Sequence, residues 1–264
     1  MDFRKLIKDI FTGNTEDLGK RFGLLKRKLQ RVGYNLSHSK LSDDELKHIP
    51  VVINNRNRYS YLLMLIGWLE KSGMSNIIIL DNDSTYLPLL KYYEETEHKV
   101  IRTEKNGGPF AIWQTEELKG VIKNYYIYTD PDVVPNDSSA FESIRLMYNR
   151  LKGDLTIDKI GFALRIDDLP EHYKLKQEVI AWEGQFWKHK DSEGFWKAKV
   201  DTTFALYAPF AKGGGECKAL RTDFPHVAAH MPWYENSSTP TEEDVYYRNQ
   251  SVAANSHWTK LTVS

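Results

Sequence analysis

The sequence predicts an α/β fold with a mostly parallel central sheet, helices on both faces of the sheet, and a helical segment in front of it. Short apolar runs at 51–53, 77–80 and 125–129 are typical of buried strands, and stretches with helical periodicity lie between them. Each run also ends in polar residues. Buried strands that alternate with helices indicate a parallel sheet whose ligand crevice lies at the carboxyl ends of its strands.

The first 48 residues differ in character from the rest. Helical periodicity extends over 3–32, where Leu18, Phe22, Leu25 and Leu29 mark one face. Basic residues are interleaved with them: Lys20, Arg21, Lys26, Arg27, Lys28 and Arg31. Such a helix fits peripheral contact of 18–32 with an anionic membrane, or packing on the domain with its charges in solvent. A polar stretch at 37–48 indicates a linker, so we expect an extension over 1–48 and an α/β domain over 49–264.

From Pro50 the expected elements follow in a regular order. Strands are predicted at 51–53, 77–80, 99–103 and 125–129, helices at 61–71 and 87–95, and a glycine-containing loop at 106–108. The second half predicts strands at 159–166 and 200–207, with a tryptophan-rich helix between them, and a short strand with an aromatic turn at 226–234.

Composition excludes several classes of protein. The 264 residues carry a formal net charge of zero with a pI near 7.1, which gives no electrostatic footprint for nucleic acid. Cys217 is the single cysteine, so an internal disulfide is excluded and a reducing compartment is favoured. The longest apolar run, 61–69, is too short to span a bilayer, and the first residues do not resemble a signal peptide. We expect a soluble, cytoplasmic protein.

Two carboxylates follow the strand at 125–129. Asp130 and Asp132 are one residue apart, so in an extended segment both side chains point to the same side and can reach one divalent cation. Carboxylate oxygens suit Mg²⁺ or Mn²⁺, and substrate phosphates often complete such sites. A nucleotide diphosphate is therefore the first ligand to consider. The alternative is an Asp-Pro-Asp turn that only caps a loop.

The segment from Pro50 to Pro135 resembles the nucleotide-sugar-binding half of a GT-A glycosyltransferase of the family 2 type. The positions that carry the resemblance are the first strand and its loop at 53–57, Asp81 after the second strand, Asn106-Gly107, and Asp130-Pro131-Asp132 after the fourth strand. The resemblance covers about a third of the chain well, and the rest only by the order of elements. It implies a nucleotide-sugar-binding half over 49–135 and an acceptor-binding half over 136–264.

The resemblance also implies roles for individual residues. Asp81 would accept hydrogen bonds from the base or ribose, unless it serves only as a helix cap. Asn54 and Arg56 would line the base pocket, and Asn106-Gly107 would let the backbone approach the nucleotide.

Three residues form the metal site that the resemblance implies. Asp130 would face the ribose or the hydration shell of the metal, and Asp132 would bind the metal directly. His230 resembles the downstream histidine that completes the metal shell in several GT-A enzymes. An imidazole ligand favours Mn²⁺ over Mg²⁺. The alternative for His230 is a hydrogen-bonded structural role.

An inverting transfer also needs a carboxylate base. Asp201 is our first candidate because it opens a predicted strand, and Asp167, Asp168 and Glu183 also qualify chemically. The acidic run at 242–244 loosely resembles the acidic pair of family 2 enzymes. Trp233 lies in the predicted turn beside His230 and is a candidate for stacking on a sugar, whereas Trp182, Trp187 and Trp196 are expected to fill the core.

We therefore expect a metal-dependent glycosyltransferase that uses a nucleotide diphosphate sugar, with UDP as the favoured nucleotide. Its acceptor would be a glycan or lipid-linked saccharide in bacterial polysaccharide biosynthesis. A haloacid-dehalogenase-like phosphatase remains an alternative because residues 130–134 read Asp-x-Asp-x-Val. A non-catalytic carbohydrate-binding protein would explain the tryptophans but not the paired aspartates. A dinucleotide-dependent oxidoreductase is disfavoured because no glycine-rich turn follows the first strand.

Overall fold

The computed structural model describes residues 15–136, 140–201, 203–214 and 217–250, and it confirms the predicted α/β class. The main sheet has seven strands in the order β3 (Lys99–Arg102), β2 (Ile77–Asp81), β1 (Val51–Asn55), β4 (Tyr126–Thr129), β8 (Ala205–Tyr207), β6 (Lys159–Gly161) and β9 (Ala219–Arg221). Only β8 runs antiparallel to its neighbours in this sheet, so the sheet is mostly parallel as expected.

A second, three-stranded sheet has the order β5 (Val133–Pro135), β10 (Val227–His230) and β7 (Ala163–Leu164). It corrects the strand predicted over 159–166, which is divided between the two sheets. Gly161 ends β6 under Val200, and the Phe162 N–H still donates to Phe204 O at 3.1 Å before the chain leaves for β10. The strand predicted from residue 200 begins only at Ala205, and before it Val200 and Phe204 O approach Gly161 closely.

The helices are α2 (Thr15–Ser37), α3 (Asp43–Lys47), α4 (Ser60–Lys71), α5 (Leu87–Glu95), α6 (Ala140–Gly153), α7 (Lys176–Glu183) and α8 (Glu242–Gln250). Short 3₁₀ segments are η1 (Gly108–Trp113), η2 (Glu116–Leu118), η3 (Val121–Lys123), η4 (Gly184–Phe186) and η5 (Met231–Tyr234). The segment predicted as a linker at 37–48 contains α3, which begins with a capping box between Ser42 and Glu45.

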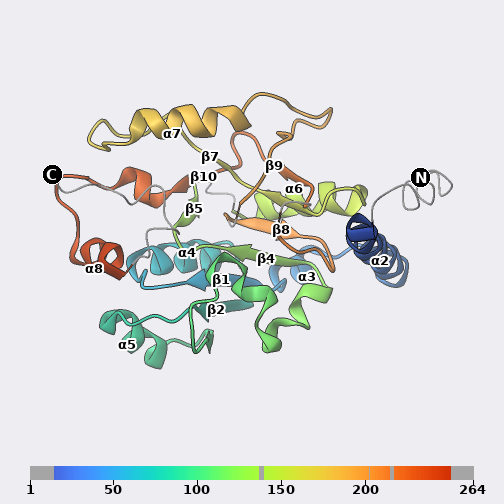
Figure 1. Ribbon diagram of the computed structural model, residues 1–264, viewed down its shortest axis with the longest axis horizontal. Coiled ribbons are helices and arrows are strands. Elements are labelled where there is room, and N and C mark those ends of the chain that lie inside the picture. The colour runs from blue at the N-terminus through green and yellow to red at the C-terminus, as the bar shows by residue number, and fades with distance from the viewer. Residues whose placement is uncertain (1–14, 137–139, 202, 215–216, 251–264) are drawn as a thin grey trace.

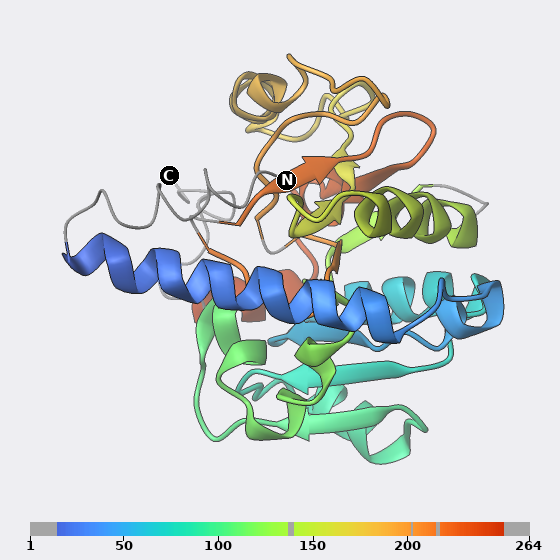
Figure 2. The same cartoon turned by 90° about the vertical axis from the view of Figure 1, so that its right-hand side faces the viewer.

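The central strands are buried because both faces of the sheet are covered. Every residue of β1, β2 and β4 is buried. Trp68 of α4 packs edge-on against Phe204 on one face, and Trp113 of η1 packs against Tyr128 and Tyr207 on the other. Figure 2 shows α4 and α6 on one side of the strands and the 3₁₀ segments on the opposite side. This two-sided burial explains why these strands read as continuous apolar runs.

Helices α2 and α8 lie at opposite ends of the molecule (Figure 1). Helix α2 packs near Tyr125, at the start of β4, where the rings of Tyr34 and Tyr125 meet edge-on at 5.9 Å. Helix α8 packs near the loops that follow β1 and β2. The carboxyl ends of the parallel strands therefore face α8, and their amino ends face α2.

Candidate functional site

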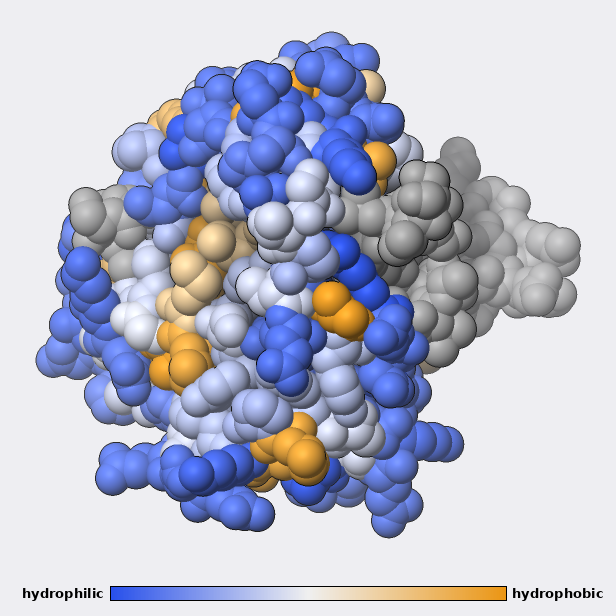
Figure 3. Space-filling view, turned by 90° about the vertical axis from the view of Figure 1, so that its left-hand side faces the viewer, coloured by the Kyte–Doolittle hydropathy of each residue, from blue (hydrophilic) through white to orange (hydrophobic). Residues whose placement is uncertain are grey.

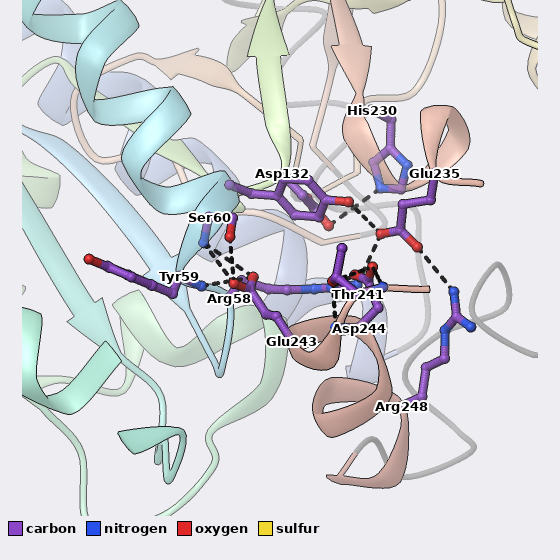
Figure 4. Close-up of polar contacts among 11 residues, drawn as sticks. Arg58, Tyr59, Ser60, Asp132, His230, Glu235, Thr241, Glu243, Asp244 and Arg248 are labelled. Atoms are coloured by element: carbon purple, nitrogen blue, oxygen red, sulfur yellow. Dashed lines mark hydrogen bonds and ion pairs between the residues drawn. The ribbon is translucent and has the colours of Figure 1, made fainter. Parts of the chain in front are cut away.

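The register of the small sheet brings Asp132 and His230 together. Strand β5 begins just after Asp132 and pairs antiparallel with β10, with Val133 opposite His230. The Met231 N–H donates to the Asp132 carbonyl oxygen at 2.8 Å. As a result, His230 Nε2 lies 3.8 Å from Asp132 Oδ2 (Figure 4). Residues 98 positions apart thus meet at the carboxyl edge of the main sheet, as the metal-site hypothesis requires.

The spacing of these two side chains is compatible with a shared cation. Two ligands at about 2.1 Å from one ion lie between about 3 and about 4.2 Å apart, depending on the angle at the metal. Burial lowers the pKa of His230, with Asp132 opposing the shift and Arg58 adding to it, so the imidazole is neutral at pH 7 and able to coordinate. His230 Nδ1 has no hydrogen-bond partner among the described residues. Within those residues no ready-made group of three metal-ligating side chains occurs, so water or substrate oxygens would have to complete the shell.

The dyad itself departs from the extended geometry that we expected. Strand β4 ends at Thr129, and Pro131 and Asp132 form a turn before β5. Asp130 and Asp132 therefore do not lie in one extended strand, and the expectation that the strand geometry points both side chains to the same side is wrong. Both carboxylates nevertheless influence the hydroxyl of Tyr247. Burial raises the pKa of Tyr247 most, Arg58 opposes this shift, and the negative charges of Asp132 and Asp130 add to it.

The loop predicted to approach a nucleotide lies over the ends of β1 and β2. Asn82 makes two hydrogen bonds to this loop. Its Oδ1 accepts the Gly107 N–H at 2.7 Å, and its Nδ2 donates to Gly108 O at 3.1 Å. Asn106 Oδ1 accepts the Gly108 N–H at 2.8 Å, and Gly108 has a φ of +67°, which favours glycine. Asn54 Nδ2 reaches Gly108 O at 3.4 Å, while Asn54 Oδ1 is buried without a partner in the described chain. Asn54, Asn106 and Gly107 thus lie together around Gly108, and their contact with a nucleotide stays a prediction.

Asp81 and Arg56 already have partners within the chain. Asp81 is fully buried, with Oδ2 3.1 Å from Arg102 Nε and Oδ1 3.3 Å from the Tyr93 hydroxyl. Arg56 Nη1 donates to the Gln250 carbonyl oxygen at 3.1 Å, which ties the loop after β1 to the end of α8. A nucleobase that binds Asp81 would have to share the Asp81 carboxylate with Arg102 and Tyr93.

Helix α8 begins with the acidic run 242–244 that loosely resembles the acidic pair of family 2 enzymes, and Glu243 and Asp244 of this run bond to the loop after β1 and to the start of α4. Glu243 accepts hydrogen bonds from the Tyr59 N–H at 3.0 Å, from the Ser60 N–H at 2.9 Å and from the Ser60 hydroxyl at 2.7 Å (Figure 4). It thereby caps the N-terminus of α4, where a dinucleotide pyrophosphate would lie in an oxidoreductase. Glu243 therefore occupies the amides that such a pyrophosphate would need.

Arg58 is the buried cation of this cluster. Its Nη1 donates to Asp244 Oδ1 at 2.8 Å, its Nη2 lies 3.8 Å from Glu235 Oε1, and its guanidinium stacks 3.7 Å from the Tyr247 ring centroid. Burial acts to lower the pKa of Arg58, but Tyr247, Asp132 and Glu235 outweigh burial, and the pKa is raised. Arg58 therefore stays charged beside Asp132.

Two acidic residues complete the cluster around Arg58. Burial raises the pKa of Glu235, which bonds to the Tyr61 hydroxyl and to Arg248 Nη2 at 3.1 Å. Asp244 forms a capping box with Thr241 at the start of α8, and this Thr-x-x-Asp pattern is visible in the sequence.

The predicted base candidates lie in three environments. Asp167 and Asp168 follow β7, which runs parallel to β10, so they lie at the His230 edge of the small sheet. Both form ion pairs with Arg165, and Asp168 Oδ1 accepts a hydrogen bond from the Tyr234 hydroxyl at 2.6 Å.

The other two base candidates lie elsewhere. Glu183 is buried in an ion pair with Arg221 at 2.7 Å. Asp201 is exposed and lies before β8 instead of opening it. Our reason for ranking Asp201 first among the base candidates is therefore wrong.

The four tryptophans of the second half differ in burial from what we expected. Trp233 is buried with its ring centroid 4.7 Å from that of His230, so it supports the imidazole from within the core instead of facing solvent. Trp187 and Trp196 pack on each other at 5.4 Å between ring centroids but are only half-buried, and Trp182 is exposed, so the prediction that these three fill the core is wrong.

The surface at the α8 end of the molecule is mainly hydrophilic, with hydrophobic residues in small separate groups (Figure 3). Among the described helices we find no apolar segment with the length needed to cross a bilayer.

Comparisons with known proteins give remote similarities. No family model matches the chain. A segment of 71 residues is 34% identical to the pesticidal crystal protein Cry28Aa of Bacillus thuringiensis subsp. finitimus, and it covers 26% of this chain and 6% of that protein. Among solved structures, S. aureus TarS 1–349 is 14% identical with a TM-score of 0.39, covering 70% of this chain and 60% of that one.

A second similar structure is glucosyl-3-phosphoglycerate synthase from Mycobacterium tuberculosis in complex with phosphoglyceric acid. It is 12% identical with a TM-score of 0.38, and the match covers 64% of this chain and 62% of that one. The chain thus spans about three fifths of the length of both solved chains.

Proposed function

We propose that the chain is a metal-dependent glycosyltransferase that takes a sugar from a nucleotide diphosphate sugar, with UDP as the first candidate nucleotide. The acceptor would be a glycan or lipid-linked saccharide of bacterial polysaccharide biosynthesis, and the transfer would invert the anomeric carbon. The observation that carries this proposal is the approach of Asp132 to His230 at the carboxyl edge of the sheet, the same edge at which Asn82 holds the loop at 106–108.

The chain's own residues have separable roles in such a transfer. Asp132 and His230, with Asp130 nearby, would hold Mn²⁺ or Mg²⁺, which when bound offsets the charge that builds on the departing diphosphate. Asn54 and the backbone of Asn106-Gly107 would contact the nucleotide, because Asn54 Oδ1 lies buried and without a described partner at the strand ends. Arg56 and Asp81 flank the same loop and would complete the base pocket.

In the reaction, the acceptor hydroxyl oxygen forms a bond to the anomeric carbon as the bond from that carbon to the diphosphate oxygen breaks. The diphosphate leaves with the electron pair, and a carboxylate takes the hydroxyl proton. Asp168 is our first candidate for this base, because it lies at the His230 edge of the small sheet and is partly exposed. Asp167 is the second candidate, whereas the ion pair of Glu183 with Arg221 makes that carboxylate less accessible to a substrate.

Thermal-shift measurements with UDP, GDP, CDP, UDP-sugars and NAD, each with and without Mn²⁺, test the proposal. A ligand that binds only the native state raises its apparent stability. We expect one nucleotide class to stabilise the wild type in a Mn²⁺-dependent way, and Asp132→Ala to abolish this stabilisation. NAD stabilisation without metal, or release of phosphate from a generic phosphoester that Asp130→Asn abolishes, would contradict the proposal. Binding of saccharides alone would favour a non-catalytic carbohydrate-binding protein.

A further inference from the structure

We propose that the outward face of α2 is an interaction surface for an anionic membrane, with Phe22, Leu29 and Leu36 as its apolar contacts. This inference concerns the end of the molecule opposite the candidate site and does not depend on the proposed reaction. It rests on how α2 is anchored, on which side chains the anchor turns outward, and on the charge of the helix.

Arg31 anchors α2 to the body of the protein. Its side chain is buried, and its Nη2 donates to Leu151 O at 2.6 Å and to Asp154 O at 3.2 Å at the end of α6. Its Nη1 donates to Ile157 O, in the connection from α6 to β6. A guanidinium suits this position because the last carbonyl groups of a helix lack intrahelical partners. The anchor therefore fixes the rotation of α2 about its own axis.

The rotation leaves a line of large apolar side chains in solvent. At about 100° per residue, Phe22, Leu29 and Leu36 lie between about 140° and about 180° from Arg31 around the helix. Their exposed fractions are 66%, 48% and 84%. The three residues repeat every seven positions, so they form one stripe along α2, and Lys26 and Gly33 beside them are also exposed. Packing against the described residues of the chain does not account for this stripe.

The charge of the helix selects an anionic partner. From Thr15 to Ser37 the sequence has six basic residues and two acidic ones, a net charge of +4, and without the buried Arg31 the helix still carries +3, whereas the whole chain has a net charge of zero. The rest of the chain therefore carries −4, and positive charge is concentrated on the one helix with the apolar stripe. Basic residues around an apolar helix face are the combination that binds anionic lipid surfaces.

A second copy of the chain is a poorer occupant for the stripe. A two-stranded coiled coil needs apolar residues at both a and d positions. If Phe22, Leu29 and Leu36 occupy the a positions, Leu25 and Val32 occupy the d positions, and these two are half-buried against the chain's own body. Only one residue in seven is then free for a partner helix. A lipid surface has no such requirement for register.

The stripe also lies where contact would leave the candidate site open. Figure 2 shows α2 crossing the end of the molecule at the amino ends of the strands, whereas the site lies at their carboxyl ends. A membrane bound along α2 would therefore not cover Asp132 and His230.

Vesicle co-sedimentation of the full chain tests the proposal. The wild type should bind vesicles that contain phosphatidylglycerol, bind pure phosphatidylcholine vesicles far more weakly, and lose affinity as salt is raised. The double substitution Leu29→Ser/Leu36→Ser should weaken binding about tenfold or more, because each leucine loses its insertion into the lipid. Leu87→Ser is the matched control, since Leu87 is 76% exposed on α5, and it should bind like the wild type.

The outcomes separate the proposal from its alternatives. Circular dichroism and the melting temperature should show that the double variant is folded. Equal binding of the double variant and the wild type, equal binding to neutral and anionic vesicles, or no binding to either would overturn the proposal. A wild-type dimer that the double variant converts to a monomer would assign the stripe to a second copy instead. None of these results depends on nucleotide binding, so failure here is distinct from failure of the proposed function.

Discussion

Glu243 of α8 caps the N-terminus of α4 at Ser60, although the two residues are 183 positions apart in the sequence. The contact fixes α8 beside the loop that follows β1, and the ion pair between Arg58 and Asp244 holds the same two segments together. Helix α8 is therefore part of the wall of the candidate site, and the stability of that wall depends on a few buried polar contacts.

The cap formed by Glu243 should contribute measurably to stability. Replacing Glu243 with Ala should lower the free energy of unfolding by about 1–2 kcal/mol, because the first amides of α4 lose their acceptor. Urea denaturation measures this change. Glu242→Ala is the control, since Glu242 is exposed and its substitution should change stability by less than about 0.5 kcal/mol. Equal effects of both substitutions would contradict the capping role.

The buried pair of Arg58 and Asp244 should be more sensitive to loss of one partner than to loss of both. Arg58→Met alone should cost about 3–5 kcal/mol, because it leaves Asp244 buried without its cation. The double variant Arg58→Met/Asp244→Leu should lose less than the sum of the two single substitutions. A double-mutant cycle from urea unfolding gives the coupling energy. Strict additivity would show that the pair does not interact as the structure indicates.

Asp191 should make the protein sensitive to acid. Burial pushes its pKa up, but hydrogen bonds from the Phe195 N–H, from Arg150 and from the Glu193 N–H outweigh burial, so its pKa is lowered in the folded state. A lowered folded pKa gives stability that is present above the unfolded pKa of about 3.9 and is lost as pH falls through the folded value.

We expect Asp191→Asn to be about 1–3 kcal/mol less stable than the wild type at pH 7. This difference should shrink as pH falls below about 4, where the wild-type carboxylate takes up its proton. Urea unfolding between pH 3 and pH 7 measures it. A difference that stays constant over this range is the opposing result.

Gly161 should tolerate no side chain. A Cβ at this position would lie 2.6 Å from Val200 Cγ1 and 2.9 Å from Phe204 O, so Gly161→Ala should destabilise the protein by about 1–3 kcal/mol through overpacking. Gly184→Ala is the matched control, because a Cβ there meets nothing within 4 Å. Thermal unfolding that gives the same melting temperature for both variants would contradict the close approach of Val200 and Phe204 to β6.

The parts of the fold that could be predicted are those encoded by local pattern. Strands β1, β2 and β4 are buried on both faces, so their apolar runs were recognisable, and the order of elements placed Asp81 and Asp132 at strand ends. The division of 159–166 between two sheets has no such signal, because it depends on Val200 packing over Gly161.

The site was predictable only where one segment carries its own chemistry. The turn at Asp132 and the histidine at 230 are visible as motifs. The roles of Arg58 and Glu235 depend on contacts with α8, such as the one between Arg58 and Asp244 over 186 positions, and no local periodicity encodes these contacts.

The central claim is that Asp132 and His230 hold one cation beside a bound nucleotide. Titration of Mn²⁺ in the presence of UDP, followed by electron paramagnetic resonance of the free ion, measures the affinity directly. We expect Asp132→Asn and His230→Ala each to weaken Mn²⁺ binding by at least about tenfold, whereas Asp168→Asn should leave it unchanged. Mn²⁺ affinity that is the same in the wild type and in both ligand variants would contradict the account.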